Sequence, residues 1–529
     1  MADEQNQYEK ERRAKRDQIR ALGLDPYGGP VEGLRPLSEV KSSYKPEMGH
    51  DAGPVVKVAG RIVLKRDFGK KLSFLTLRDD SGDLQVALDA KRLPEQAWQL
   101  RDLLDLGDQL VAEGALGTTK TGEVTVWATS ISMASKALLP PPSKHEGLAD
   151  VEARYRQRYV DLWSNPEVMQ IMRLRIRVVE EVRAFMRERG FLEVETPMMQ
   201  VLHGGAAAKP FKTHHNALDI PLFLRVAPEL FLKRLLVGGF TKIFEVNRNF
   251  RNEGISPRHN PEFTMLEAYE AYGSWETMAE LVESIICRIA QNVFGGLRIR
   301  RAGGGEINLE GDTSKPAGYR WRRAAMSELV SEKTGWNFDK RPLQDADPKL
   351  LEVLSHEHPT SIVRVDGETS PARSKLLREL QNSSKSVNYD EISRMSPAEQ
   401  FVLLYEKYVE PNLIDPVFVT HVPSVIVPLA RENKEDPFFC DVYELAMNGI
   451  EISPGYSELN DPDKQREHFM HQVGDKEEQQ MVDEDFLTAL KYGMPPAGGM
   501  GLGIDRLVMT LTGAESLRDV ILFPLMKPH

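Results

Sequence analysis

Hydrophobic and polar residues alternate along five segments in the first quarter of the chain, and this period of two predicts short β-strands. The five segments span residues 54–64, 71–79, 82–90, 108–117 and 122–133. A stretch with helical spacing, residues 93–104, separates the third segment from the fourth. Because five strands with a helix in that position are typical of an OB-fold, we predict a small β-barrel here.

The phase of the alternation assigns side chains to the inside and the outside of this barrel. Leu75 and Val86 fall on the inward face, whereas Phe74 and Gln85 fall on the outward face. An outward aromatic ring beside an outward amide can stack on an unpaired base and hydrogen-bond to its edge. A lone surface phenylalanine usually has no such role, so an ordinary exposed ring is the alternative.

The pattern changes after residues 138–146, whose three consecutive prolines favour a stiff, extended linker. Asn165 and Pro166 suit the N-cap and first turn of a helix, apolar residues then recur at helical spacing, and Gly190 ends the pattern. A strand is predicted next, over residues 191–197. Helical and strand-like patterns mix from here onwards, which indicates an α+β domain.

We therefore predict a multidomain α+β protein with two parts. Residues 1–146 hold an N-terminal helix, the OB-fold domain and the linker, and residues 147–529 form the second domain. Within the second domain, residues 303–395 are polar and irregular, and we interpret them as inserted helices and loops.

The most informative local pattern is a predicted hairpin whose turn lies within residues 250–272, FRNEGISPRHNPEFTMLEAYEAY. Alternation after the turn places Phe263, Glu267 and Tyr269 on one face, and Arg251 ends the strand before the turn. An arginine fork suits phosphate oxygens, and a ring suits a flat base. The ordinary alternative is an exposed hairpin with a solvated charged face.

A second predicted hairpin spans residues 440–453, with Asn448 and Gly449 as a two-residue turn. That turn pairs Met447 with Ile450, Ala446 with Glu451, and Glu444 with Ser453. Two glutamates, Glu444 and Glu451, then share one face, where a hard divalent cation such as Mg²⁺ would relieve their repulsion. Two solvated glutamates are the alternative.

A glycine-rich strand precedes an apolar helix in residues 495–513, PPAGGMGLGIDRLVMTLTG. Glycine lets a flat ligand approach the backbone closely, and Arg506 at the start of the helix could reach a phosphate. Tight packing of the strand explains the glycines equally well.

Composition narrows the class of protein. A chain of 529 residues with 41% hydrophobic and 28% charged residues predicts a soluble protein of two or more domains. No apolar run has the length of a membrane span, and the N-terminus lacks a secretory signal. Two distant cysteines fit a cytoplasmic protein. The net charge of −11 argues against nucleic-acid binding as the sole function, although local basic patches remain compatible with it.

Taken together, these sequence segments resemble those of the class II aminoacyl-tRNA synthetases, in particular the bacterial lysyl-tRNA synthetases. Residues 250–272 resemble motif 2, GFLEVETPMM with Pro197 resembles motif 1, and the run ending in GIDR resembles motif 3. HGGAAAKPF, APEL and GYSELNDP resemble the amino-acid pocket of lysyl-tRNA synthetases. The resemblance implies a catalytic domain on an antiparallel sheet flanked by helices, an anticodon-binding OB-fold, and a homodimer formed through motif 1.

The resemblance also implies a reaction and its residues. L-lysine would be activated with ATP to lysyl-adenylate and transferred to the 3′ end of tRNA(Lys), with Arg251 on the α-phosphate and Arg506 on the γ-phosphate. The implied ATP-binding residues are Arg251, Glu253, Arg258, His259, Asn260, Phe263 and Arg506. The implied lysine-binding residues are Gly205, Glu229, Glu267, Tyr269, Tyr456 and Glu458. Glu444 and Glu451 would hold Mg²⁺, and Arg66, Phe74 and Gln85 would bind the anticodon.

One residue departs from this pattern. Pro454 stands where the family usually has an asparagine, so a side-chain amide is missing, and proline is expected to break the strand before Glu458. Three alternatives stay open. An aspartate or asparagine synthetase should carry a basic or amide group in place of Glu229 and Glu458. A paralogue that modifies a protein lysine should lack the anticodon-binding domain. An RNA-binding module with an inactive synthetase domain should have lost Arg251 or Arg506.

Overall fold

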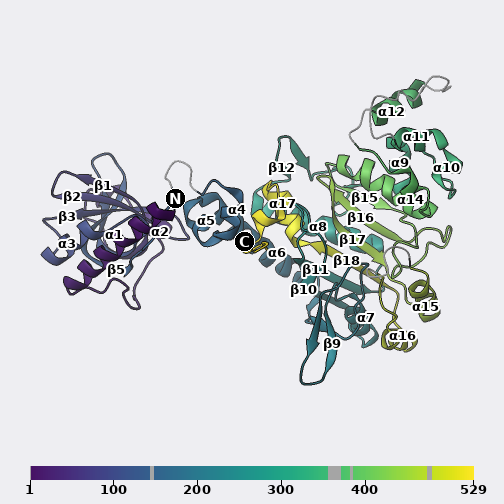
Figure 1. The fold of residues 1–529 in the computed structure, drawn as a ribbon, viewed down its shortest axis with the longest axis horizontal. Coiled ribbons are helices and arrows are strands. Elements are labelled where there is room, and N and C mark those ends of the chain that lie inside the picture. Colours follow the sequence, from purple (N-terminus) through teal and green to yellow (C-terminus); the bar gives the residue numbers. More distant parts are fainter. Residues whose placement is uncertain (1, 143–147, 356–370, 382–384, 473–478, 529) are drawn as a thin grey trace. The chain divides into compact units, whose positions relative to one another are not determined.

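The computed structural model describes residues 2–142, 148–355, 371–381, 385–472 and 479–528 (Figure 1). The chain forms two compact units, Met1–Gln170 and Ile171–His529. The predicted domain boundary between residues 146 and 147 falls outside the described residues. The first unit continues beyond it through α4 (Val151–Arg156) and α5 (Arg158–Ser164).

The first unit contains a closed five-stranded barrel in the order β1-β2-β3-β5-β4, which confirms the predicted OB-fold. Its strands are β1 (Val55–Phe68), β2 (Leu72–Arg78), β3 (Asp83–Asp89), β4 (Gln109–Thr118) and β5 (Val124–Ser135). Helix α3 (Glu95–Leu103) lies in the predicted place between β3 and β4, and α1 (Ala2–Ala21) and α2 (Leu37–Ser42) precede the barrel. Leu75 and Val86 are fully buried in its core, because every second side chain of a barrel strand points inward.

The second unit is built on an eight-stranded sheet in the order β14-β15-β16-β17-β18-β11-β10-β6 (Figure 1). The strands are β14 (Arg322–Ala325), β15 (Val417–Thr420), β16 (Val442–Met447), β17 (Ile450–Ser457), β18 (Ala497–Gly503), β11 (Glu262–Ala271), β10 (Lys242–Phe250) and β6 (Leu192–Glu193). The inner pairs are antiparallel, as expected, whereas β14–β15 and β10–β6 at the two edges are parallel. The sheet is therefore mixed.

Three helices pack on one face of this sheet, and the site lies on the opposite face. Helices α6 (Pro166–Glu188), α8 (Trp275–Phe294) and α17 (Ile504–Thr512) pack with Phe244, Leu266 and Leu502 in one core. Strand alternation turns the neighbouring Glu245 and Glu267 to the opposite face. The strand predicted over residues 191–197 shortens to β6, which pairs with β10 at only two positions.

The segment predicted as an insertion begins within the main architecture. Its strand β14 pairs with β15 in the large sheet. The following helices build a separate core around Trp336, Leu350 and Phe401. They are α9 (Met326–Thr334), α10 (Leu343–Ala346), α11 (Pro348–Ser355), α12 (Pro371–Gln381), α13 (Tyr389–Ile392) and α14 (Pro397–Leu404). The added layer therefore starts at α9, after β14.

Smaller elements complete the second unit. They are β7 (Met199–Gln200), β8 (Lys212–His215), β9 (Ile220–Leu224), α7 (Glu229–Val237), β12 (Arg298–Arg300), β13 (Glu306–Asn308), α15 (Pro462–Met470), α16 (Glu484–Lys491) and α18 (Leu517–Val520). Helices α7 and α16 share a core with Phe469 and Tyr269. None of the helices in the described residues is long and apolar enough to cross a membrane.

Candidate active site

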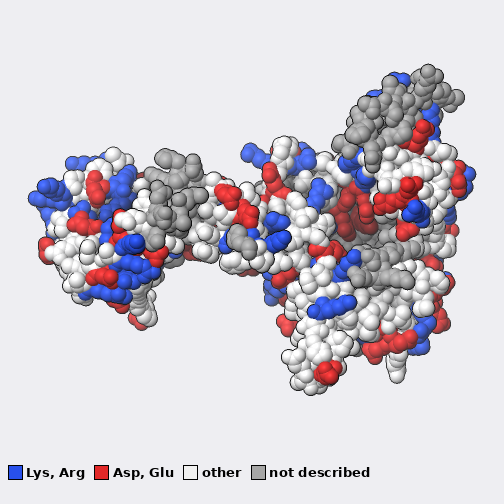
Figure 2. Space-filling model, viewed as in Figure 1, with Lys and Arg blue, Asp and Glu red and all other residues white. Residues whose placement is uncertain are grey.

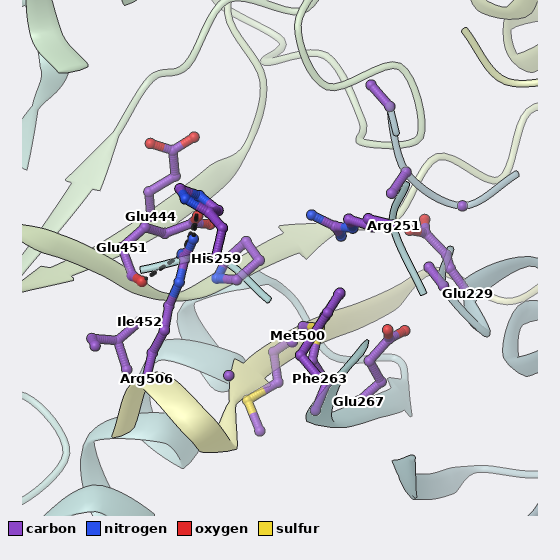
Figure 3. A pocket seen from close by; sticks show the side chains of 18 of the residues that line it. Glu229, Arg251, His259, Phe263, Glu267, Glu444, Glu451, Ile452, Met500 and Arg506 are labelled. Atoms are coloured by element: carbon purple, nitrogen blue, oxygen red, sulfur yellow. Dashed lines mark hydrogen bonds and ion pairs between the residues drawn. The ribbon is translucent and has the colours of Figure 1, made fainter. Parts of the chain in front are cut away.

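The face of the large sheet opposite α6, α8 and α17 carries a cavity of about 410 Å³. Strands β11, β16, β17 and β18, the loop after β10, the start of α7 and the start of α17 all contribute to its wall. Figure 3 shows how the labelled side chains divide it into two ends joined by Arg251 and Phe263. One end holds Glu444, Glu451, His259 and Arg506, and the other holds Glu229 and Glu267 (Figure 3).

The cavity brings together nearly all of the predicted ATP, metal and lysine residues. Its lining includes Gly205, Glu229, Arg251, Glu253, Arg258, His259, Asn260, Phe263, Glu267, Tyr269, Glu444, Glu451, Tyr456 and Arg506. Sequence reasoning missed Gln480 and the loop from Ile426 to Ala430, which also line it. Gln480 accepts a hydrogen bond from the backbone N–H of Gly205 at 2.9 Å, a contact across 275 residues that no local pattern could predict.

The β10–β11 hairpin places its residues as the alternation predicted. Glu245 pairs with Glu267 and Asn249 pairs with Phe263 across the two strands. Arg251 follows the end of β10, and its guanidinium carbon lies 5.1 Å from the centre of the Phe263 ring. The buried Nε of Arg251 has no hydrogen-bond partner among the described residues. The hairpin therefore aims a cation and an aromatic plate into the same space.

The β16–β17 hairpin corrects one predicted pairing. Met447 opposes Ile450 and Ala446 opposes Glu451, as predicted, but the register then shifts and Glu444 opposes Pro454 instead of Ser453. A bulge of this kind inserts one extra residue into a strand, which the turn sequence cannot reveal. Both glutamates nevertheless line the cavity.

Acidic side chains crowd around Glu444. Burial, followed by the charges of Glu451, Glu410 and Glu406, raises the pKa of Glu444 well above its usual range. Burial also raises the pKa of Glu410 to about 7. Figure 2 shows this acidic area in a hollow over the region of β15 to β17. Sequence reasoning missed Glu406 and Glu410, which come from the turns after α14.

Arg506 pairs with Glu451 at this acidic end. Its guanidinium donates to the Glu451 carbonyl oxygen at 2.9 Å, to Glu451 Oε2 at 3.3 Å and to His259 Nε2 at 3.3 Å (Figure 3). Burial and then the charge of Arg506 lower the pKa of His259, so its ring is neutral and can accept this hydrogen bond. Arg258 donates to the Gly449 carbonyl oxygen at 3.0 Å.

The opposite end of the cavity is lined by buried carboxylates and phenols. Burial, followed by the charges of Glu229 and Glu245, raises the pKa of Glu267 well above its usual range. Burial is also the main cause that raises the pKa of Tyr269 and Tyr456. A cationic ligand would relieve this repulsion, because an opposite charge favours the ionised carboxylate.

Glu458 lies apart from the lysine-binding residues with which it was predicted. It is not among the described residues that line the cavity, and its carboxylate lies 2.5 Å from Lys233 Nζ, behind the wall. The expected strand break at Pro454 is absent, because β17 continues to Ser457. Pro454 has no N–H to donate to the neighbouring strand. The hydroxyl of the preceding residue, Ser453, donates to the Gly501 carbonyl oxygen on that strand, so this oxygen still has a donor.

The anticodon prediction needs one correction. Gln85 is buried rather than exposed, because its Oε1 accepts from Arg66 at 2.8 Å and its Nε2 donates to Thr125 at 2.9 Å. Phe74 is half-buried, with ring centres 5.4 Å from Phe68 and 6.1 Å from Trp127. The alternation fixed the face correctly but could not show that neighbouring side chains cover Gln85.

Comparison with known proteins identifies the class. A family model described as tRNA synthetases class II (D, K and N) matches residues 150–527, and one described as OB-fold nucleic acid binding domain matches residues 56–134. The chain therefore belongs to the class II tRNA synthetases.

Individual relatives narrow the family further. A lysine--tRNA ligase from Carboxydothermus hydrogenoformans is 44% identical over 533 residues, covering 99% of each chain. One from Syntrophomonas wolfei is 42% identical over 99% of this chain and 98% of its own. One from Pseudomonas aeruginosa is 45% identical over 90% of this chain and 86% of its own. The relatives thus place the chain among the lysine--tRNA ligases of that class.

Proposed function

We propose that this protein activates L-lysine with ATP to lysyl-adenylate and pyrophosphate and then transfers the lysyl group to the 3′ end of tRNA(Lys). The observation that carries the proposal is the cavity on the large sheet, whose two ends suit a triphosphate and a diammonium amino acid. The family relationship supports the same reaction. A carboxylate-lined amino-acid end also disfavours aspartate and asparagine as substrates, since their side chains would need a basic or amide group.

The ATP end works by positioning and by charge. Arg251 binds the α-phosphate, Arg506 binds the γ-phosphate, and Phe263 stacks on adenine. Glu253, Arg258, His259 and Asn260 surround the nucleotide. The lysine carboxylate attacks the α-phosphorus as pyrophosphate leaves, and donors fixed in advance stabilise the charge that develops. The carboxylate is already ionised, so this step needs no general base.

Magnesium fits the acidic end. No group of three His, Cys, Asp or Glu side chains in the described part of the chain is arranged to hold a metal alone. Glu444 and Glu451 supply the one or two carboxylates that Mg²⁺ commonly takes besides phosphate oxygens. Burial and then the charge of Glu451 raise the pKa of Glu444, and a cation bound beside it would favour its ionised form. Bound there, Mg²⁺ would neutralise phosphate charge.

The amino-acid end selects lysine by charge. The carboxyl groups of Glu229 and Glu267 line the cavity, and Tyr269 and Tyr456 add phenol groups. Removing water from an ammonium group costs on the order of several kcal/mol, as for any buried ion. An opposite charge in the pocket offsets this cost. Gly205 keeps the wall open, since a Cβ there would lie 3.1 Å from the side chains of Ala227 and Glu229.

The OB-fold unit binds the anticodon of the tRNA. Lys and Arg side chains gather over this barrel in Figure 2, which suits a phosphate backbone. Phe74 with Phe68 supplies a stacking surface, and Arg66 and Gln85 form a linked pair beside it. Gln85 would read a base edge only after giving up part of this pairing.

The homodimer is proposed through motif 1. Apolar side chains near Pro197 are strongly exposed, with Leu192 at 57%, Met199 at 58% and Val201 at 62%. Such a cluster marks an interaction surface. Sedimentation equilibrium should show a dimer for the native chain and a monomer for Met199→Asp, whereas an unchanged mass would contradict this interface. A cytoplasmic location belongs to the same proposal.

Pyrophosphate exchange across all twenty amino acids tests the function. We expect ATP–pyrophosphate exchange with L-lysine and little with the other nineteen. Exchange driven by another amino acid would overturn the specificity, and no exchange with lysine would overturn the reaction.

A further inference from the structure

A buried lysine of the protein itself lies behind the amino-acid end of the cavity. The Lys233 side chain is fully buried, one helical turn after Glu229 on α7. Its Nζ lies 2.8 Å from Glu229 Oε1 and 2.5 Å from Glu458 Oε2, and it donates to the Leu429 carbonyl oxygen at 3.1 Å. Two carboxyl groups and one carbonyl oxygen therefore surround this ammonium group.

The three acceptors belong to separate parts of the wall. Glu229 begins α7, Leu429 lies in the loop that lines the cavity, and Glu458 follows the end of β17. Only Glu229 and Leu429 reach the cavity among these three. Lys233 therefore contacts these residues on the side away from the cavity, and it is not among the described residues that line the cavity.

Among the described residues, the cations of the protein do not pair with every acidic residue around this end of the cavity. Glu245 is already neutralised by Arg225 at 2.7 Å. Lys233 is one cation between two carboxylates, and Glu267 lies in the cavity wall without an ion pair among the described residues. The resident cations thus pair with only some of these carboxyl groups, and a cationic ligand would favour the ionised form of Glu267.

Gly499 has no side chain, and the Glu458 carboxyl group and the Tyr269 ring occupy the space that a side chain would take. A Cβ there would lie 1.9 Å from Glu458 Oε1 and 2.6 Å from the ring of Tyr269. The carboxylate of Glu458 and the ring of Tyr269 therefore both pack against Gly499, and this packing fixes the position of the carboxylate relative to Lys233.

We infer that Lys233 is a positioning residue for the substrate: it fixes Glu229 toward the cavity and neutralises Glu458 behind the wall. This inference rests on the proposed activation of lysine. Lys233 touches no reacting atom, so its effect passes through Glu229. Its removal should therefore weaken the binding of lysine and leave the binding of ATP unchanged.

The test is Lys233→Met, which keeps most of the side-chain length and removes the charge. We expect the KM for lysine in pyrophosphate exchange to rise about tenfold or more, as for the loss of a hydrogen bond to a charged group. The KM for ATP should change less than about twofold, because the substitution removes no contact at the ATP end of the cavity. Lys242→Met is the matched control. Lys242 forms a partly exposed ion pair with Glu270 at 2.7 Å, and neither residue lines the cavity.

A second variant separates positioning from folding. Lys233→Met alone leaves the buried carboxyl group of Glu458 without its ion pair, whereas Lys233→Met with Glu458→Gln removes both members of the pair. We expect the double variant to recover thermal stability and still to show the raised KM for lysine, because Glu229 has lost its ion pair with Lys233. A normal KM for lysine in either folded variant would overturn the inference. If the native enzyme itself failed to exchange with lysine, the proposed function would fall instead.

Discussion

Arg506 has two partners, Glu451 and His259, that belong to the same proposed nucleotide end. A triphosphate must compete with Glu451 for this guanidinium, and a cation at Glu444 and Glu451 would compensate the glutamate that is released. Arg251 differs, since its Nε has no hydrogen-bond partner among the described residues. Arg251 is therefore preorganised for a ligand, while Arg506 must exchange partners.

Arg251→Ala tests this preorganised contact. We expect lysine-dependent pyrophosphate exchange to fall by about 100-fold or more, the usual loss when one transition-state donor is removed. Arg248→Ala, three residues earlier on β10, is the control, because Arg248 is exposed and pairs with Glu262 at 3.0 Å. Near-normal exchange by a folded Arg251→Ala protein would contradict the phosphate assignment.

Gly499→Ala tests the close approach behind the amino-acid pocket. The added methyl would lie 1.9 Å from Glu458 Oε1, so the carboxylate must move. Overpacking of this kind costs about 1–3 kcal/mol, and we expect a lower Tm together with a raised KM for lysine. In the control Gly296→Ala the methyl meets no atom within 4 Å. Equal Tm values for the two variants would argue against the packing described.

At the scale of elements, the β16–β17 hairpin and the turns after α14 together create the acidic end. Neither element is unusual alone, since glutamates are common in hairpins and turns. Their meeting buries Glu444 beside Glu451 and Glu410 and raises its pKa. The repulsion is thus a property of the assembled elements, and it predicts how stability depends on pH.

Glu410→Gln tests that dependence. The pKa of Glu410 is about 7 in the folded protein and about 4.5 for a free glutamate, so between these values the folded state holds a proton that the unfolded state has released. The free energy of unfolding therefore falls as pH rises through this window. Without added metal, Tm should fall less from pH 5 to 7.5 in Glu410→Gln than in the native protein. Glu352→Gln, at an exposed position on α11, should behave like the native protein.

At the scale of the whole molecule, the two compact units divide two tasks. The sheet of the second unit carries the cavity, and the barrel of the first unit carries the aromatic group of Phe68, Phe74 and Trp127. Activation of lysine needs only the cavity, whereas charging also needs the tRNA. Variants in the barrel should therefore separate the two activities.

Phe74→Ala should weaken aminoacylation of tRNA(Lys) and spare pyrophosphate exchange. Loss of one stacked base costs about 1–3 kcal/mol, which predicts a higher KM for tRNA by roughly one to two orders of magnitude. Tyr27→Ala is a suitable control, because Tyr27 is an exposed aromatic residue of the same unit outside the barrel strands. An equal loss in both assays would show that the barrel surface is not the anticodon reader.

The sequence by itself determined the elements and the faces of their strands. Periods of two and of 3.6 residues report burial directly, so the barrel, the helix from Pro166 and the placing of Phe263 and Glu267 on one face followed from local pattern. The turn at Asn448 and Gly449 likewise fixed the first pairs of its hairpin. Motif resemblance then named the residues that line one cavity.

Tertiary structure decided what depends on contacts between distant segments. The bulge that moves Glu444 opposite Pro454, the covering of Gln85, and the approach of Glu410 to Glu444 all involve packing or charge across separate elements. The same holds for Lys233, whose position between Glu229 and Glu458 depends on a helix and a strand end 225 residues apart in the chain. Local pattern records which face a residue takes, but only the folded chain shows which charges meet there.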